Sequence, residues 1–286
     1  MAAMLLFLFI AGCESASDAA GTIEANAAEA GARTLGVGYA AVRVSPSQVH
    51  EGNLILVNRK YPIEESAMPN DIVKLAGHME RIPGIGLLDG SIRLSESLAV
   101  KFAAMTKAAE ADGVHHFMIN SGFRDMDEQR ELYAEKGGSY ALPAGYSEHN
   151  AGLSLDIGSS LAAMENAPEG RWLQDNAWKY GFVLRYPKDK TDVTGIEYEP
   201  WHFRYVGLPH SFVMKNKNMV LEEYLDYLKK ERSIRVTIGD DVYTITHYPV
   251  PEEGADVAVP ASGSGEYELS GDNRDGVIVT VKLPPA

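Results

Sequence analysis

The chain has 286 residues, of which 45% are hydrophobic, and it carries a formal net charge of -14 at pH 7. This length allows a substantial buried core, and we expect one large domain with, at most, a small appendage. The acidic balance argues against a nucleic-acid partner, because phosphate binding needs Lys and Arg gathered on one face. The only cysteine is Cys13, which excludes an internal disulfide.

The N-terminal segment has features of an export signal. Residues 4–12 read MLLFLFIAG, which is shorter than the roughly 20 apolar residues of a bilayer span but long enough for a secretory signal. Ile10-Ala11-Gly12-Cys13 resembles a bacterial lipobox, in which Cys13 would carry the lipid. We therefore expect an extracytoplasmic protein anchored to the bacterial cell membrane. Because no Lys or Arg precedes the run, a plain cleaved or anchoring leader and a buried N-terminal helix are the alternatives.

The organisation of the remaining chain follows its composition. Residues 14–35 consist mainly of Ala, Ser, Glu and Gly, which predicts a disordered tether. The aliphatic run at residues 54–57 predicts the beginning of ordered structure. The expected parts are a leader at 1–13, the tether at 14–35, a main domain at 36–232 and a small β appendage at 233–286.

Helical spacing of apolar residues is clearest at residues 95–112. Leu98, Phe102 and Met105 recur there at intervals of four and three residues, which places them on one helix face. The expected elements of the main domain are, in chain order, this helix, a strand at 117–120, helices at 125–136 and 172–180, a strand at 182–184 and a helix at 217–232.

The C-terminal appendage has a strand pattern. Ile234, Val236 and Ile238 alternate with polar residues before a turn, and the chain returns in a strand at 242–248. Residues 276–281 repeat the β-rich composition. Because helices and strands do not alternate regularly along the chain, the sequence predicts an α+β fold.

Two of the eight histidines have carboxylates close by in the sequence. His149 precedes Asp156 by seven residues, and His202 follows Glu199 by three. Two His and one Asp form a three-ligand set that leaves a fourth position open, as a catalytic zinc requires, and Glu199 could then act as general base. Pro200 excludes the helical Glu-x-x-His motif. By spacing alone the metal site is a weak prediction, and ordinary polar residues in loops are the alternative interpretation.

Three separated motifs occur in order along the chain. They are Ser121-Gly122-Phe123-Arg124, then Ser147-Glu148-His149 with Gly152 and Asp156, then Glu199-Pro200-Trp201-His202. Together they resemble the signature of the VanY-type zinc D-Ala-D-Ala carboxypeptidases, which belong to peptidase family M15, subfamily B. The likeness covers about residues 53–282.

This resemblance implies a Hedgehog/DD-peptidase zinc-binding fold, an antiparallel sheet with flanking helices, and makes the main domain the catalytic domain. It implies that His149, Asp156 and His202 hold one zinc ion per chain and that Glu199 is the catalytic base. Arg124 matches the arginine that polarises the scissile carbonyl and stabilises the oxyanion, a role that suits a fixed guanidinium. A salt bridge with the following helix is the alternative for Arg124.

Three further side chains are candidates for contacts with substrate. Gln129 lies on the helix after the first motif and could place its amide in the cleft. Ser147 could hydrogen-bond the substrate backbone or its terminal carboxylate. Exposed or purely structural roles are the alternatives for both residues. Trp201 is expected to form a wall of the pocket, or else to be a core residue.

By resemblance, the chain is expected to be a zinc metallopeptidase that removes the terminal D-Ala from peptidoglycan pentapeptide stems, or their lipid-linked precursor, ending in D-Ala-D-Ala. Removal of this residue would lower sensitivity to glycopeptide antibiotics such as vancomycin. Two alternatives remain. One is an L,D-carboxypeptidase that acts on tetrapeptide stems, and the other is a non-catalytic module that binds the cell wall.

Overall fold

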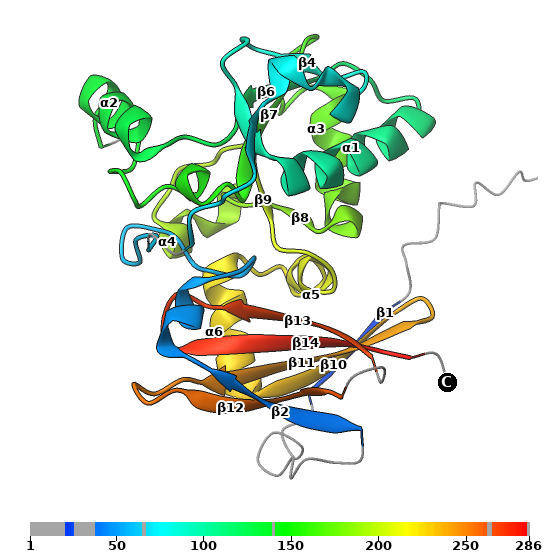
Figure 1. Cartoon of the computed structure of the whole chain (residues 1–286). Helices are drawn as coiled ribbons and strands as arrows, with labels where there is room; N and C mark the ends of the chain where they lie inside the picture. The colour runs from blue at the N-terminus through cyan, green and yellow to red at the C-terminus, as the bar shows by residue number, and fades with distance from the viewer. Residues whose placement is uncertain (1–20, 26–37, 65–66, 139–140, 262–264, 285–286) are drawn as a thin grey trace, which may run out of the picture.

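The chain folds into two lobes, which lie one above the other in Figure 1. The computed structural model describes residues 21–25, 38–64, 67–138, 141–261 and 265–284, so the expected leader and its Cys13 lie outside the described residues. The upper lobe, here called the mixed lobe, contains a sheet with helices packed against it, and the lower lobe, the β lobe, is built mainly from strands. Within the described ranges, no helix is long and apolar enough to cross a membrane.

Most helices belong to the mixed lobe, whereas most of the long strands belong to the β lobe. The α-helices are α1 (Glu96–Ala111), α2 (Met126–Lys136), α3 (Pro168–Asn176), α4 (Thr191–Thr194), α5 (His210–Lys217) and α6 (Leu221–Glu231). The 3-10 helices are η1 (Pro46–His50), η3 (Leu75–Gly77), η4 (Met79–Arg81), η5 (Glu148–Ala151), η6 (Ala177–Tyr180) and η7 (Lys188–Lys190). The strands are β1 (Gly21–Ala25), β2 (Tyr39–Val44), β3 (Ile72–Lys74), β4 (Gly86–Leu87), β5 (Arg93–Ser95), β6 (Phe117–Ser121), β7 (Ser154–Ser159), β8 (Phe182–Leu184), β9 (His202–Tyr205), β10 (Ser233–Ile238), β11 (Asp241–Pro249), β12 (Ala255–Pro260), β13 (Glu266–Gly271) and β14 (Gly276–Leu283).

The central sheet of the mixed lobe has one apolar and one polar face. Its strand order is β4-β6-β7-β9-β8, and its strand pairs are antiparallel except for β4 with β6. Successive strand residues point to opposite faces. Leu155, Ile157 and Phe203 therefore point to one face and join the core, whereas Asp156 and His202 lie on the other.

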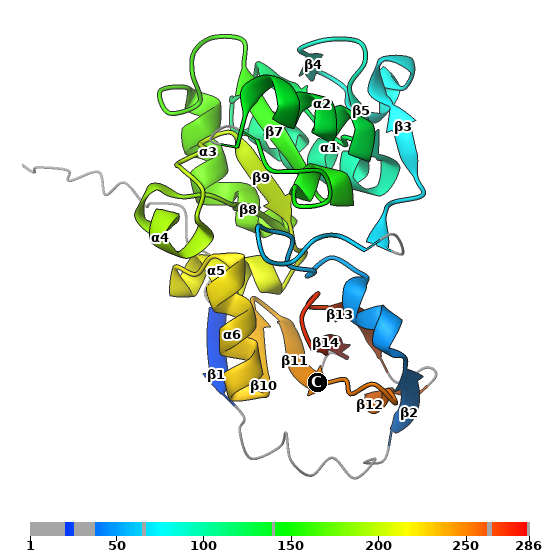
Figure 2. The ribbon, with the colours of Figure 1, turned by 90° about the vertical axis from the view of Figure 1, so that its left-hand side faces the viewer.

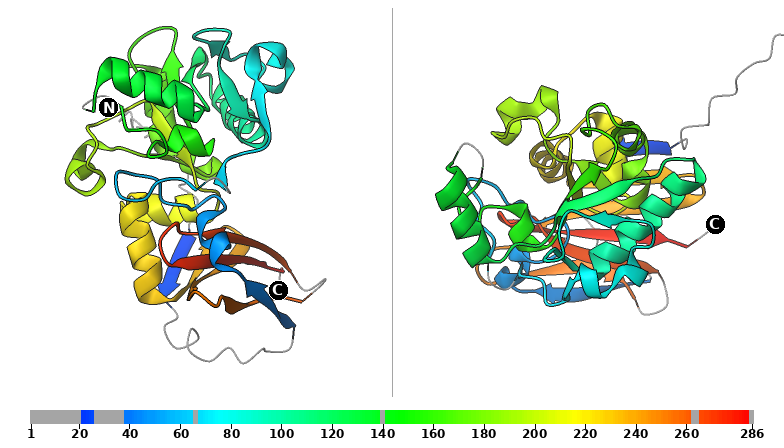
Figure 3. Two further views of the ribbon diagram at one scale, coloured as in Figure 1. Left: turned by 60° about the vertical axis from the view of Figure 1, so that its left-hand side comes forward. Right: turned by 90° about the horizontal axis from the view of Figure 1, so that it is seen from above.

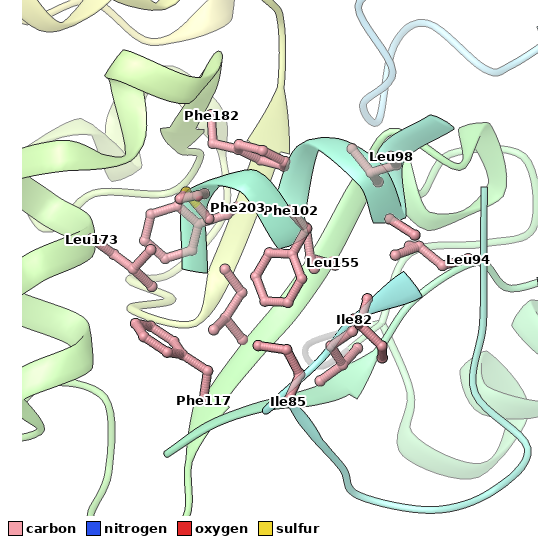
Figure 4. Packing of buried hydrophobic residues seen from close by; sticks show 14 of the residues in the cluster. Ile82, Ile85, Leu94, Leu98, Phe102, Phe117, Leu155, Leu173, Phe182 and Phe203 are labelled. Carbon is pink, nitrogen blue, oxygen red and sulfur yellow. The ribbon is translucent and has the colours of Figure 1, made fainter. Parts of the chain in front are cut away.

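Helices α1 and α3 cover the apolar face. Phe102 of α1, Phe117 of β6, Leu155 of β7 and Leu173 of α3 belong to one cluster, which Figure 4 shows from close by. Phe102 has no exposed surface, and burial of such a side chain contributes roughly 1.5–3 kcal/mol. This core fixes the strands from behind, so the polar face presents its side chains from a rigid support.

The β lobe is built around a fully antiparallel sheet with strand order β1-β10-β11-β14-β13. Strand β14 shows why both faces of this sheet are covered. Val277 and Val279 pack toward the pair formed by β2 and β12, while Ile278 packs toward α6 on the opposite face. Figure 2 shows α6 on one side of this sheet and β2 with β12 on the other.

The two lobes share a buried apolar cluster. Trp178 of η6 and Val183 of β8 come from the mixed lobe, and they join Phe212 of α5 and Leu225 of α6 in this cluster. The ring centroids of Trp178 and Phe212 lie 5.5 Å apart. In Figures 1 and 3, α5 lies at the boundary between the lobes, and α6 runs from there along the sheet of the β lobe. The position of α6 relative to the mixed lobe is therefore fixed by buried side chains.

The structure confirms the α+β prediction, and α1 and α2 occupy the segments predicted as helices at 95–112 and 125–136. The side chain of Asp125 caps the start of α2 by accepting hydrogen bonds from two backbone N–H groups, and Glu128 completes the capping box. Strong local signals of this kind make helix ends predictable from sequence.

The prediction of a disordered tether is wrong for Gly21–Ala25, which form β1. This strand pairs antiparallel with β10, and Ile23 packs against the shared apolar cluster. The segment is ordered because the edge of β10 offers hydrogen-bond partners to its backbone, and the composition of the segment does not reveal this pairing. Strand β2 also precedes residues 54–57, where ordered structure was expected to begin. The β lobe thus combines two N-terminal strands with the predicted C-terminal appendage.

Candidate metal centre

The register of two neighbouring strands brings Asp156 and His202 together. They are direct partners across β7 and β9. Asp156 Oδ1 lies 3.2 Å from His202 Nδ1. The tight pairing of the two strands, backed by the core behind them, fixes this distance.

His149 reaches the same point from the short helix η5. Its Nε2 lies 3.4 Å from Asp156 Oδ1, and its ring stands edge-on to that of His202 with centroids 4.9 Å apart. The helix ends at Gly152, whose φ of 65° is left-handed, and a Cβ there would come within 2.7 Å of the Pro69 side chain. A glycine is therefore needed at 152 for the chain to turn from η5 into β7.

Hydrogen bonds on the outer sides of the two rings set which nitrogens face the centre. His149 Nδ1 donates to the backbone oxygen of Gly122 at 2.6 Å, because a carbonyl oxygen can only accept. His202 Nε2 donates to Glu148 Oε2 at 3.3 Å. These bonds leave His149 Nε2 and His202 Nδ1 facing Asp156, and a metal bound there would take the place of any proton on His202 Nδ1. Metal-binding histidines in proteins are oriented in this way by outer hydrogen bonds.

The donor set fits zinc. One ligand atom from each of His149, Asp156 and His202 lies within 4.8 Å of the others. Asp156 Oδ1 is buried without a hydrogen-bond partner, although both rings are near it. Two imidazole nitrogens and one carboxylate oxygen that point to a common position are the ligands of an open zinc site. The predicted metal ligands are therefore brought together by the fold.

The electrostatics of the centre favour a cation. Burial lowers the pKa of His202, but the carboxylates of Asp156 and Glu148 outweigh burial and raise the pKa to about 9. Burial raises the pKa of Asp156, yet the two rings bring it below its usual value. Burial and the nearby Arg124 lower the pKa of His149, which keeps this ring neutral and able to bind a metal.

Glu148 supports His202 from the side away from Asp156, and the sequence reasoning gave it no role. Its side chain has no exposed surface, and its Oε1 accepts hydrogen bonds from Arg185 Nε and Arg204 Nη1, both at 2.8 Å. Its Oε2 accepts from Ser154 Oγ at 3.0 Å as well as from His202. Burial raises the pKa of Glu148, but the two guanidinium groups hold it well below its usual range.

Glu199 lies beside the centre on the turn before β9. Its Oε2 is 3.7 Å from His202 Nδ1, and its side chain is 25% exposed. The backbone of the turn is held because Glu199 N–H donates to Tyr186 O at 3.1 Å. Burial, assisted by the charge of Asp156, raises the pKa of Glu199, as suits a group that accepts and returns protons near neutral pH.

Arg124 follows β6 and is held in place by Gln129. The Nη1 of Arg124 donates to Gln129 Oε1 at 2.7 Å, and Gln129 Nε2 donates to the backbone oxygen of Leu142 at 2.7 Å. The backbone N–H of Arg124 donates to His149 O at 3.2 Å, which ties it to the metal ligands. Gln129 has no exposed surface. The predicted contact of Gln129 with substrate does not fit this burial, since both ends of its amide are engaged within the protein.

The other two candidates for substrate contacts differ in exposure. Ser147 is buried at the start of η5, where its Oγ accepts from the His149 N–H at 3.4 Å. Trp201 is 40% exposed and directly precedes His202. The exposure excludes a core role for Trp201 and leaves its side chain accessible to a ligand. Substrate binding by these two residues stays a prediction.

A second group of potential ligands, His247, Asp272 and Asp275, lies in the β lobe. Asp272 Oδ1 accepts three backbone N–H groups of the turn that follows it, and Asp272 Oδ2 pairs with His247 Nε2 at 3.1 Å. Asp275 pairs with Lys229. These carboxylates are occupied within the protein, so the group holds a turn together and differs from the open set around Asp156.

The comparisons with known proteins agree with this geometry. The model of the VanY family, D-alanyl-D-alanine carboxypeptidase, matches residues 91–208. A D-alanyl-D-alanine carboxypeptidase of Enterococcus faecium is 58% identical over 238 residues, which make up 83% of this chain and 78% of that protein. The chain belongs to the VanY family.

Two solved structures place this VanY chain among zinc peptidase folds. The vancomycin resistance D,D-dipeptidase VanXYg, in complex with a D-Ala-D-Ala phosphinate analog, has a TM-score of 0.74 and 25% identity, and the match covers 85% of this chain and 99% of that one. A mutant of the D,D-pentapeptidase VanY from a VanB-type resistance cassette, in complex with Zn(II), has a TM-score of 0.50 and 31% identity over 60% of this chain and 98% of that one. These likenesses confirm the predicted DD-peptidase fold and zinc as the cofactor.

Proposed function

We propose that the protein is a zinc D,D-carboxypeptidase that hydrolyses the terminal D-Ala of peptidoglycan stems ending in D-Ala-D-Ala. The observation that carries this proposal is the convergence of His149, Asp156 and His202 on one point, with Glu199 and Arg124 beside it. The identity of 58% to a D-alanyl-D-alanine carboxypeptidase supports the substrate. The substrate is a pentapeptide stem in peptidoglycan or in its lipid-linked precursor.

His149, Asp156 and His202 would hold the zinc ion. When bound there, zinc supplies a Lewis acid that polarises the scissile carbonyl and lowers the pKa of water. Because His202 Nε2 and His149 Nδ1 are both tied to buried acceptors, the protein holds the two rings in orientation before the metal arrives.

Glu199 moves the proton. Its carboxylate takes a proton from the water that attacks the carbonyl carbon, and then gives it to the nitrogen of the leaving D-Ala. The raised pKa of Glu199 brings its two protonation states closer in free energy at neutral pH, which suits both transfers.

Arg124 binds the oxygen on which negative charge develops. Its guanidinium is anchored by Gln129, so the donors are fixed before the reaction begins. A charged donor that needs no reorganisation lowers the barrier most where charge builds up in the transition state. Trp201 would form a wall of the pocket, and Ser147 would hydrogen-bond the substrate backbone or its terminal carboxylate.

Two synthetic stems test the proposed specificity. We expect D-Ala release from a pentapeptide stem that ends in D-Ala-D-Ala and much slower release from the matching tetrapeptide. Faster cleavage of the tetrapeptide would instead assign L,D-carboxypeptidase activity. Removal of the D-Ala-D-Ala terminus would also lower sensitivity of cells to vancomycin, which binds that terminus.

We further propose that the protein acts outside the cytoplasm and is anchored to the membrane through Cys13. The support is the lipobox-like sequence at residues 10–13, after an apolar run of signal length. Fractionation of cells that express the wild type and Cys13→Ser tests this anchor. The wild type should be in the membrane fraction and Cys13→Ser should leave it, whereas equal membrane association of both would exclude a lipid on Cys13.

A further inference from the structure

A chain of buried ionic contacts connects the metal centre to the β lobe. It begins at Glu148, which accepts the outer hydrogen bond of His202. The second oxygen of Glu148 accepts from Arg185 Nε and Arg204 Nη1 at 2.8 Å each. With Ser154 included, both oxygens of Glu148 receive two donors, and a carboxylate has about four acceptor positions. Glu148 is therefore held on all sides, and it in turn holds the ring of His202.

Arg185 carries the connection across the boundary between the lobes. Its Nη1 and Nη2 donate to the two oxygens of Glu222 on α6, at 2.9 and 2.8 Å. The Arg185 side chain has no exposed surface, and the side chain of Glu222 is 15% exposed. A two-bond contact between a guanidinium and a carboxylate fixes direction as well as distance. Glu222 thus sets the orientation in which Arg185 meets Glu148.

We propose that Glu222, on α6 of the β lobe, is a positioning residue for the metal ligand His202. It acts through Arg185 and Glu148, so that the β lobe completes the metal centre of the mixed lobe. This inference rests on the proposed zinc site of His149, Asp156 and His202.

Charge balance gives the physical reason. The buried set contains two guanidinium groups, Arg185 and Arg204, and two carboxylates, Glu148 and Glu222, so its charges cancel. Neutralising Glu222 leaves one unpaired buried positive charge close to the ring that faces the metal. This charge opposes the binding of a divalent cation, and Arg185 keeps at most one of the two hydrogen bonds that fix its plane, because an amide has one acceptor oxygen.

The second guanidinium is anchored independently of α6. Arg204 Nη2 donates to the backbone oxygens of Asn53 and Ile55 at 2.9 Å each. Loss of Glu222 therefore leaves Arg204 in place and disturbs the contact of Glu148 with Arg185. A substitution at 222 is for this reason a more selective probe than a substitution of Glu148, which would strand both guanidinium groups.

The test is zinc binding by Glu222→Gln, measured by competition with a chromophoric chelator at a temperature where circular dichroism shows the protein folded. We expect the zinc dissociation constant to rise by up to about tenfold, because Glu222 supports the outer partner Glu148, whose own loss would cost about 10–100-fold. The absorption bands of the Co(II)-substituted protein should shift, because the His202 ring changes orientation. Asp226→Asn is the matched control, since Asp226 lies on the same helix, is 66% exposed and pairs only at the surface with Arg274.

The outcomes separate this inference from the zinc site itself. Unchanged zinc affinity and Co(II) bands in Glu222→Gln, with lower unfolding stability alone, would show that the contact only joins the lobes and would overturn the inference. Failure of the wild type to bind zinc would overturn the proposed site instead. If Glu222→Gln does not fold, Glu222→Asp is the second variant, because it keeps the charge on a shorter side chain. Its zinc affinity should be lower than that of the wild type and higher than the affinity expected for Glu222→Gln. Wild-type affinity in Glu222→Asp would then contradict the inference.

Discussion

Asp156 and His202 are direct partners across strands β7 and β9, and their Oδ1 and Nδ1 atoms lie 3.2 Å apart. The pairing depends on sheet register, because a slip of one residue would turn either side chain toward the apolar core. His149 joins them from a neighbouring 3-10 helix, with its Nε2 3.4 Å from the same oxygen. The register of the sheet therefore places two members of the candidate metal centre, and the 3-10 helix beside it places the third.

Asp156→Asn should abolish tight zinc binding while the fold is retained. The amide has the shape of the carboxylate but lacks the negative charge that a buried cation needs. We expect zinc affinity to fall more than about 100-fold, beyond the usual effect of changing an outer partner of a metal ligand. Chelator competition measures the affinity. The exposed Asp192→Asn on α4 is the control, and wild-type affinity in Asp156→Asn would mean that another group binds the metal.

Glu199→Gln should separate catalysis from metal binding. The variant keeps the side-chain shape but cannot accept a proton, so we expect kcat for D-Ala release to fall roughly 10²–10⁴-fold. Zinc affinity should change little, since the Glu199 carboxylate stands outside the three ligands. Glu197→Gln, an exposed neighbour, should keep wild-type rates. Retention of more than about a tenth of wild-type kcat in Glu199→Gln would exclude Glu199 as the main base.

Arg124 and Gln129 should act as one unit. Arg124→Ala removes the charged donor and should lower kcat roughly 10²–10³-fold. Gln129→Met leaves Arg124 without its 2.7 Å anchor and should lower kcat less. In the double variant, Gln129→Met should lower kcat almost no further than Arg124→Ala alone, because no guanidinium remains for Gln129 to hold. Simple multiplication of the two effects would instead show that Gln129 acts independently, and the exposed Gln174→Met controls for the residue change.

The stability of the β lobe should depend on pH through His210. This residue is buried against Tyr224 and Thr280, and burial lowers its pKa to about 3. The unfolded chain takes up a proton near pH 6.5 while the folded chain stays neutral, so stability is present above about pH 6.5 and is lost as the pH falls toward 3.

Urea unfolding at about pH 7.5 and about pH 5.5 measures this loss. The free energy of unfolding should be lower at about pH 5.5, one pH unit below the pKa of the unfolded histidine, by about 1.4 kcal/mol. Between the same two pH values, the free energy of unfolding of His210→Gln should decrease by about 1.4 kcal/mol less than that of the wild type. Equal pH dependence in the variant and the wild type would show that His210 does not cause the effect. The comparison of the two slopes removes contributions from other titrating groups.

The sequence predicts parts of the fold whose signals are local. The helices at α1 and α2 have clear spacing and caps, and their positions are confirmed. Strand β7 was missed although a signal exists, since Leu153, Leu155 and Ile157 alternate with small or polar residues. The short length of the run and its small residues concealed that alternation. Strand β1 has no comparable signal, because it forms on the edge of β10 far along the chain.

The same distinction holds at the metal centre. His149, Asp156 and His202 belong to motifs that resemble a known family, so the sequence alone was enough to name them as candidate ligands, and the fold brings them together. Glu148 stands inside one of these motifs, yet its role depends on Arg185 and Arg204, which are 37 and 56 residues away. A short sequence motif cannot reveal contacts between residues that lie so far apart in the sequence. The outer support of the metal ligands therefore becomes visible only in the folded chain.

The most direct test of the account is D-Ala release from a pentapeptide stem by metal-free protein to which zinc is added back. The protein should be inactive after dialysis against a chelator, and activity should rise with added zinc until one equivalent per chain is bound. Asp156→Asn, treated identically, should stay inactive at that level of zinc. Full D-Ala release by the metal-free wild type would contradict a zinc centre at His149, Asp156 and His202.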